Sequence, residues 1–185
     1  MQLKNTEQGY GAVAKGFHWV IALLILGLLG LGLYMGTLKP GPRMFNLFAL
    51  HKSFGITVLL LASMRLLWRL INTHPLPLPG HKQWERIMAK LVHGALYCAM
   101  FLMPLSGWVM SSAKGFSVSW FGLFTLPNFV PRDKILAHNA VEFHETLAWV
   151  LMGLIALHFA GAIKHHLIDR DGTLRRMLPG CGAKG

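Results

Sequence analysis

Two histidines, His144 and His158, lie in one long apolar stretch that runs from Val141 to His166. They are 14 residues apart. In a helix this spacing is just under four turns, so both imidazoles project from nearly the same face, roughly 21 Å apart along the axis. An ionisable side chain inside a membrane-spanning helix is costly and is by default a sign of function. Two such side chains on one face, at two depths, predict two stacked sites.

Three further histidines, His18, His51 and His93, each lie near the start of another apolar stretch. The first stretch, Phe17 to Leu38, holds 22 residues without Asp, Glu, Lys or Arg, which is enough to cross about 30 Å of hydrocarbon. Its glycines at 27, 30, 32 and 36 permit close helix packing or leave room for a flat cofactor.

The apolar stretches predict spans at about 15–38, 45–70, 87–111 and 140–166, separated by proline-rich connections and followed by a polar tail, 167–185. Proline removes a helical hydrogen bond, so a helix does not pass through such connections. The expected fold is therefore all-α, an integral membrane four-helix bundle that forms a single domain over residues 1–185. The long connection 113–139 is too apolar for a free loop and too short and broken to cross, which favours an interfacial flap over the bundle.

The composition agrees with a membrane protein. Of the 185 residues, 54% are hydrophobic and only 14% are charged, whereas soluble domains carry roughly 25% charged residues. The net charge of +11 lies between apolar runs and not on a polar surface, which argues against a nucleic-acid partner and for a lipid one. The two cysteines, Cys98 and Cys181, form no C-x-x-C-H motif and exclude covalent c-type haem; a disulfide between them is not expected. No cleavage site follows the first apolar run, so we expect it to be a retained span.

The basic residues also predict the orientation. With four spans, the N-terminal segment, the second connection with its flanks, and the tail hold 12 of the 18 Lys and Arg residues. The positive-inside rule then places both termini in the cytoplasm.

Orientation sorts the histidines by depth: His51 and His144 belong to an outer layer, and His18, His158 and His93 to an inner one. Two facing imidazoles suit haem, whose porphyrin supplies the other four iron ligands, better than zinc, which takes four protein or water ligands. Either His18 or His93 could complete the inner site with His158. The alternative for any single histidine near the end of a span is contact with interfacial water.

Arg65 lies 14 residues after His51, on the same helical face but at inner depth, where it could pair with a haem propionate. The alternative is that Arg65 and Arg69 only anchor the cytoplasmic side. His165 and His166 are expected to contact lipid headgroups, with quinone binding as the alternative.

Several of these segments carry a family resemblance. The sequences F-H-W, L-H-K-S, F-H-E-T-L-A and KHHLIDRDGTLRRM resemble the bacterial cytochrome b561 family over essentially the whole chain. The 14-residue histidine pair is also similar to that of the di-haem cytochrome b subunits of formate dehydrogenases and nickel hydrogenases. The resemblance implies two b haems stacked across the bilayer, an inner one held by His18 and His158 and an outer one held by His51 and His144. His93 is then not a ligand, and as the unused inner histidine it could hydrogen-bond a haem propionate or a quinone.

The resemblance also implies an inner-membrane electron carrier coupled to ubiquinone. One activity in the bacterial family is superoxide oxidation at the periplasmic side, which makes a superoxide:ubiquinone oxidoreductase the expected enzyme. Lys114, Arg132 and Lys134 in the outer connection could attract such a small anion, or could contact lipid phosphates. The alternatives are a haem b anchor subunit that relays electrons between the quinone pool and a partner redox protein, and a transporter or haem-binding sensor.

Overall fold

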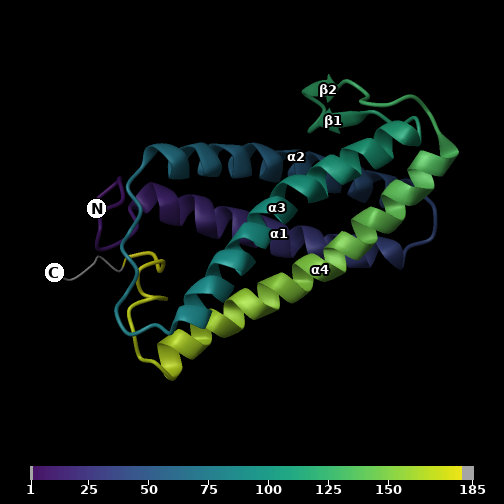
Figure 1. The fold of residues 1–185 in the computed structure, drawn as a ribbon. Coiled ribbons are helices and arrows are strands. Elements are labelled where there is room, and N and C mark those ends of the chain that lie inside the picture. The colour runs from purple at the N-terminus through teal and green to yellow at the C-terminus, as the bar shows by residue number, and fades with distance from the viewer. Residues whose placement is uncertain (1, 181–185) are drawn as a thin grey trace. The chain divides into compact units, whose positions relative to one another are not determined.

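The computed structural model describes residues 2–180. Four long helices dominate the fold: α1 (Ala12–Gly36), α2 (Pro42–Ile71), α3 (Gln83–Ala113) and α4 (Lys134–Leu167) (Figure 1). All four are long and apolar enough to cross a membrane, which confirms the predicted four-span helical class. Cys181 and Lys184, which entered the sequence arguments on disulfides and orientation, lie outside the described residues.

The helices expose apolar side chains to an unusual degree. In the most apolar part of each helix, only 6% to 17% of the residues are buried within the protein. Leu23, Leu67 and Trp149 are among the large hydrophobic side chains left more than 60% exposed. A soluble surface rarely carries contiguous apolar area on this scale, whereas hydrocarbon solvates it without cost.

Helix α4 begins at Lys134, earlier than the predicted start near residue 140. The cause is Asp133, whose Oδ1 accepts hydrogen bonds from the backbone N–H groups of Ile135 at 2.8 Å and Leu136 at 3.0 Å. A carboxylate in this position satisfies helix donors that would otherwise have no partner and favours the start of the helix. The connection between α3 and α4 is correspondingly shorter than predicted.

The connection between α3 and α4 adds a small element to this all-α fold, because it folds as a two-stranded antiparallel sheet. The strands are β1 (Val118–Trp120) and β2 (Phe124–Leu126). The turn is closed by a 2.9 Å hydrogen bond from Leu123 N to Trp120 O, and both central residues, Phe121 and Gly122, have positive φ angles. This is the type I′ geometry preferred in hairpins. The sequence W-F-G-L lacks the usual Asn-Gly signal, so the turn could not be read from it.

Side-chain hydrogen bonds fix the hairpin to α2. Ser53 Oγ accepts a 3.1 Å hydrogen bond from the backbone N–H of Phe121. The indole N–H of Trp120 donates to Thr57 Oγ1 at 3.1 Å. The predicted flap is therefore an ordered element packed on α2.

Contacts between backbone positions divide the chain into two compact units, and each unit takes one part of every helix. The first unit contains the described residues of Met1–Ile21, Leu61–Tyr97 and Gly153–Gly185, and the second contains Ala22–Leu60 and Cys98–Met152. The single domain over residues 1–185 stays a prediction.

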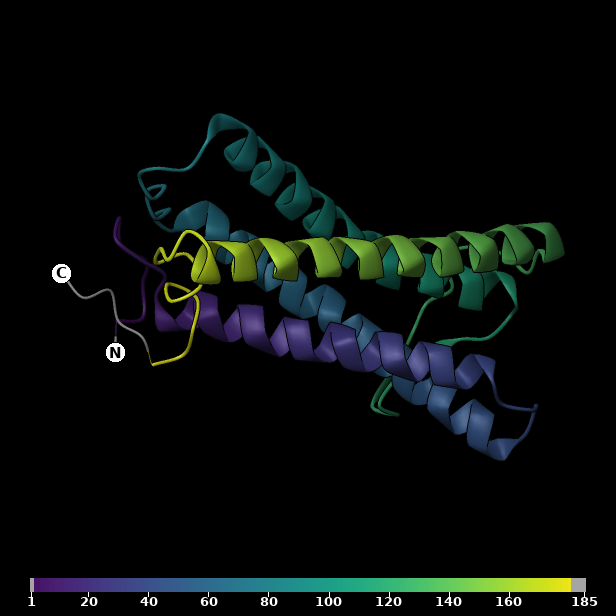
Figure 2. The same ribbon diagram turned by 90° about the horizontal axis from the view of Figure 1, so that it is seen from below.

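In the first unit, the tail after α4 lies beside the start of α1 (Figure 2). Lys15 Nζ donates to the carbonyl of Leu178 at 3.1 Å, and Trp19 Nε1 donates to that of Met177 at 2.9 Å. The tail is thus packed against the start of α1, the helix that carries His18.

Candidate functional site

In the second unit, His51 of α2 lies beside His144 of α4. Their ring centroids are 6.3 Å apart and the ring planes are inclined by 70°. Both side chains are half-buried and line a cavity of about 680 Å³ whose walls are mostly apolar. Volumes of this order are typical of sites that enclose a small molecule or cofactor.

Hydrogen bonding assigns the tautomer of His144. Ser106 Oγ lies 2.8 Å from His144 Nδ1, and the same hydroxyl donates its proton to the carbonyl of Met103 at 2.8 Å. Because the hydroxyl has only one proton, it must act as the acceptor toward His144. The imidazole therefore carries its proton on Nδ1, which leaves the lone pair of Nε2 free to bind a metal.

Two glycines allow backbone to approach the imidazoles closely. A Cβ atom added at Gly32 would lie 3.6 Å from His51 Cε1, and one added at Gly107 would lie 3.3 Å from His144 Cε1. The second distance is tight, so Gly107 keeps space beside the ring that an alanine would take. Among the described residues, Nδ1 of His51 is one of the few buried polar atoms without a hydrogen-bond partner. Such an orphan is frequently explained by a group that is not part of the chain.

The first unit brings together the three histidines predicted for the inner layer, His18, His93 and His158. The ring centroid of His158 lies 6.1 Å from that of His18 and 5.2 Å from that of His93. His18 and His158 are half-buried, and His93 is exposed. Both inner candidates of the sequence analysis are therefore neighbours of His158.

Arg65 joins this cluster. Its Nη2 lies 3.2 Å from Nδ1 of His18. Because a guanidinium can only donate, Nδ1 is the acceptor, and the proton of a neutral His18 lies on Nε2. His18 would therefore bind a metal through Nε2 only after this proton moved to Nδ1 and the contact with Arg65 was released. The guanidinium carbons of Arg65 and Arg69 each lie 5.6 Å from the centre of the Tyr97 ring, a distance at which a cation is attracted to the ring face. Arg65, which follows His51 by 14 residues in the sequence, is thus a cation in contact with His18.

The separation of the rings tests whether two imidazoles could hold one metal ion between them. An imidazole nitrogen binds a metal such as zinc at about 2.0–2.1 Å, so two imidazoles with an ion between them would have centroids about 6.3 Å apart. The His18–His158 and His51–His144 pairs, at 6.1 and 6.3 Å, fit this value. The His93–His158 pair, at 5.2 Å, is too close. The separations fit two bis-histidine sites, and the His18–His158 site requires Arg65 to release Nδ1 of His18.

The comparisons with known proteins agree with this chemistry. The family model described as prokaryotic cytochrome b561 matches residues 9–180. The chain belongs to the prokaryotic cytochrome b561 family. It is therefore a membrane electron-transfer protein, and membership implies haem b as a cofactor.

Three curated relatives align with 88% to 96% of this chain. Cytochrome b561 homolog 2 of Escherichia coli strain K12 is 38% identical over 96% of this chain and 95% of that protein. Cytochrome b561 homolog 1 of the same strain is 31% identical over 88% of this chain and 92% of its own length. A Yersinia pestis protein named probable superoxide oxidase CybB is 27% identical over 92% of this chain and 96% of its own length.

Three residues of these two sites were not singled out from the sequence, namely Ser106, Gly107 and Tyr97. A serine and a glycine in a membrane helix are ordinary packing residues, and a tyrosine there is ordinary in an aromatic belt. Their contact with an imidazole or a guanidinium depends on which helix face meets which neighbour, and that is a property of the tertiary structure.

Proposed function

We propose that this cytochrome b561 family protein is a membrane oxidoreductase that takes electrons from superoxide and delivers them to ubiquinone. We assign one haem b to His18 and His158 and a second to His51 and His144, with Arg65 as the cation that pairs with a propionate of the first. The protein would lie in the bacterial inner membrane with both termini in the cytoplasm.

The single observation that carries the proposal is the separation of the two histidine pairs, 6.1 and 6.3 Å between ring centroids. Haem iron held by two histidines supplies reversible one-electron transfer and has no open position for oxygen. The chain's own contribution is to hold the imidazoles. Ser106 keeps the proton of His144 on Nδ1, and Gly107 leaves space beside that ring.

A basic pocket in the second unit supports superoxide as the donor. A cavity of about 450 Å³ is lined by Lys114, Arg132, Lys134 and His138 around the buried Ala137. The α3 helix ends beside it in a Schellman motif, in which Phe116 N donates to Ser111 O and Gly115 N donates to Ser112 O. The φ angle of +80° at Gly115 and the 3.3 Å approach of Arg132 Cδ to its Cβ position favour glycine there. A concave cluster of cations raises the local concentration of a small anion.

The ligand assignment is tested by haem stoichiometry in the purified, detergent-solubilised protein. We expect two haems per chain in the wild type. His51→Ala and His144→Ala should each remove one haem, and His18→Ala should remove the other. His93→Ala should retain both, because His93 lies too close to His158 for axial ligation. Retention of both haems in His18→Ala with loss in His93→Ala would reassign the first site to His93.

The donor and acceptor are tested separately. Rapid mixing of the oxidised protein with superoxide should reduce haem within the dead time or shortly after it, and ubiquinone should then be reduced with re-oxidation of the haem. If the haems stay oxidised with superoxide but are reduced by ubiquinol, the donor is wrong and a relay between the quinone pool and a partner redox protein takes its place.

A further inference from the structure

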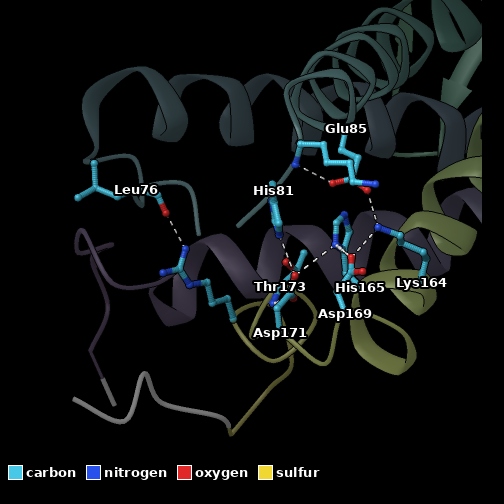
Figure 3. Close-up of polar contacts among 10 residues, drawn as sticks. Leu76, His81, Glu85, Lys164, His165, Asp169, Asp171 and Thr173 are labelled. Atoms are coloured by element: carbon cyan, nitrogen blue, oxygen red, sulfur yellow. Dashed lines mark hydrogen bonds and ion pairs between the residues drawn. The ribbon is translucent and has the colours of Figure 1, made fainter. Parts of the chain in front are cut away.

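A second histidine cluster lies in the first unit, outside the haem sites proposed above (Figure 3). It consists of His81 from the connection before α3, His165 from the last turn of α4, and Asp171 from the tail. Among the described residues, these three form the one group of at least three His, Cys, Asp or Glu side chains whose ligand atoms all lie within 4.8 Å of one another. The three residues are far apart in the sequence, and the fold brings them together.

The distances within the cluster are close to those of a metal site. Asp171 Oδ2 lies 2.8 Å from Nε2 of His81 and 3.2 Å from Nδ1 of His165. Ligands held at about 2.0–2.1 Å from a tetrahedral zinc ion lie about 3.4 Å from each other. The His81–Asp171 pair would have to open by about 0.6 Å and the His165–Asp171 pair by about 0.2 Å to make room for the ion. The three side chains are 16% to 18% exposed, so the site is largely screened from bulk water and still open to entry.

The Nδ1 atom of His165 is available as a metal ligand. Its Nδ1 is buried and, among the described residues, makes no hydrogen bond of acceptable geometry, although it lies 2.7 Å from Asp169 Oδ2 and 3.2 Å from Asp171 Oδ2. The carboxylates thus approach this nitrogen without accepting a well-aligned proton from it. The close, tilted rings of His81 and His165, with centroids 4.4 Å apart, place two imidazoles on the same side of Asp171.

The charges around the cluster also favour a cation. The carboxylate of Asp171 accepts hydrogen bonds from Nε2 of His81 at 2.8 Å and from the backbone N–H of Thr173 at 2.7 Å. Lys164 lies beside the cluster, and its charge is offset by two carboxylates, Glu85 and Asp169 (Figure 3).

We propose that His81, His165 and Asp171 bind a divalent transition-metal ion of the zinc type, with water in the fourth position. Two imidazoles and one carboxylate with an open position are a ligand set that zinc and similar ions accept. The bound ion would join the connection before α3, the end of α4 and the tail, and so fasten the tail to the unit that contains His18.

The test uses the full-length, haem-loaded protein carrying an affinity tag without histidine. Equilibrium dialysis against zinc chloride, followed by elemental analysis, should find one zinc per chain. Absorption at the zinc K-edge, where haem iron does not interfere, should show two imidazole nitrogens in the first coordination shell. His81→Gln and Asp171→Asn should weaken zinc binding at least tenfold. His74→Gln, which changes an exposed histidine in the same connection, should bind zinc as the wild type does.

The proposal is overturned if the wild-type protein binds no zinc at micromolar concentrations, if its K-edge spectrum contains no imidazole, or if Asp171→Asn binds zinc as tightly as the wild type. The spectrum of the wild type is decisive even if a variant folds poorly. In all of these cases the cluster is only an ion-pair network that holds the tail. Because the readout is zinc itself, the result is independent of the haem assignment.

Discussion

Ser106 of α3 and His144 of α4 are joined by a 2.8 Å contact between Oγ and Nδ1, in which the serine acts as the acceptor because its proton is already donated to Met103. The serine thereby determines which ring nitrogen of His144, a candidate metal ligand, carries the proton. The partner of the non-ligating nitrogen fixes the orientation and basicity of an imidazole.

Replacing Ser106 by alanine should weaken haem retention at the His51–His144 site, by about 10- to 100-fold if the serine acts as such partners usually do. The His18–His158 site should stay loaded. Haem content and potentiometric titration of each haem measure the two effects, and Ser106→Thr, which keeps the hydroxyl, should restore retention. Equal haem content in Ser106→Ala and wild type, with no change in potential, would show that the contact is only packing.

Replacing Gly107 by alanine should disturb the same site by a steric route. The new Cβ would lie 3.3 Å from His144 Cε1, so the imidazole must move by a few tenths of an ångström. We expect partial loss of one haem or a changed low-temperature spectrum of that haem, and a larger effect for Gly107→Val. Gly27→Ala is the matched control, because nothing lies within 4 Å of a Cβ at Gly27. If Gly27→Ala and Gly107→Ala behave alike, proximity to His144 does not matter.

Arg65 and Arg69 form a natural pair of variants. Both guanidinium groups lie 5.6 Å from the Tyr97 ring centre, but the hydrogen bond to His18, at 3.2 Å, comes from Arg65. Removing a cation close to an iron disfavours the reduced, less positively charged state. Arg65→Gln should therefore lower the midpoint potential of the haem at His18–His158, and Arg69→Gln should lower it less. Redox titration of both variants measures these potentials. An equal shift of the midpoint potential in the two variants would mean that Arg65 acts only through long-range charge.

The basic pocket near Ala137 predicts how fast the protein reacts with superoxide. Replacing Lys114, Arg132 and Lys134 together by glutamine should slow the reaction with superoxide by at least tenfold at low ionic strength, and should flatten its dependence on salt. Haem content should not change. Lys39→Gln, which also changes a cation predicted for the outer side, is the control. A triple variant that keeps the wild-type rate and salt dependence would remove this pocket as the entrance.

The membrane-spanning architecture could be predicted from the sequence because lipid leaves a chain few choices. Every backbone polar group in hydrocarbon must be satisfied internally, so a long apolar stretch is almost always a helix. The four predicted spans accordingly match α1 to α4, and the ends differ most at α4, where Asp133 caps the helix earlier than the apolar pattern suggested. The shared face of His144 and His158 follows from helical periodicity alone.

Only the tertiary structure decided which side chains meet. The hairpin β1–β2 depends on a turn at Phe121 and Gly122 that has no strong sequence signal, and on anchoring to α2. The proton of His144 is assigned by a serine on another helix, and the His81–His165–Asp171 cluster draws its members from three separate segments. Helical periodicity is a local property that each segment carries by itself. These contacts depend instead on how helix faces and connections pack, so the residues that hold them remain ordinary in the sequence until the chain is folded.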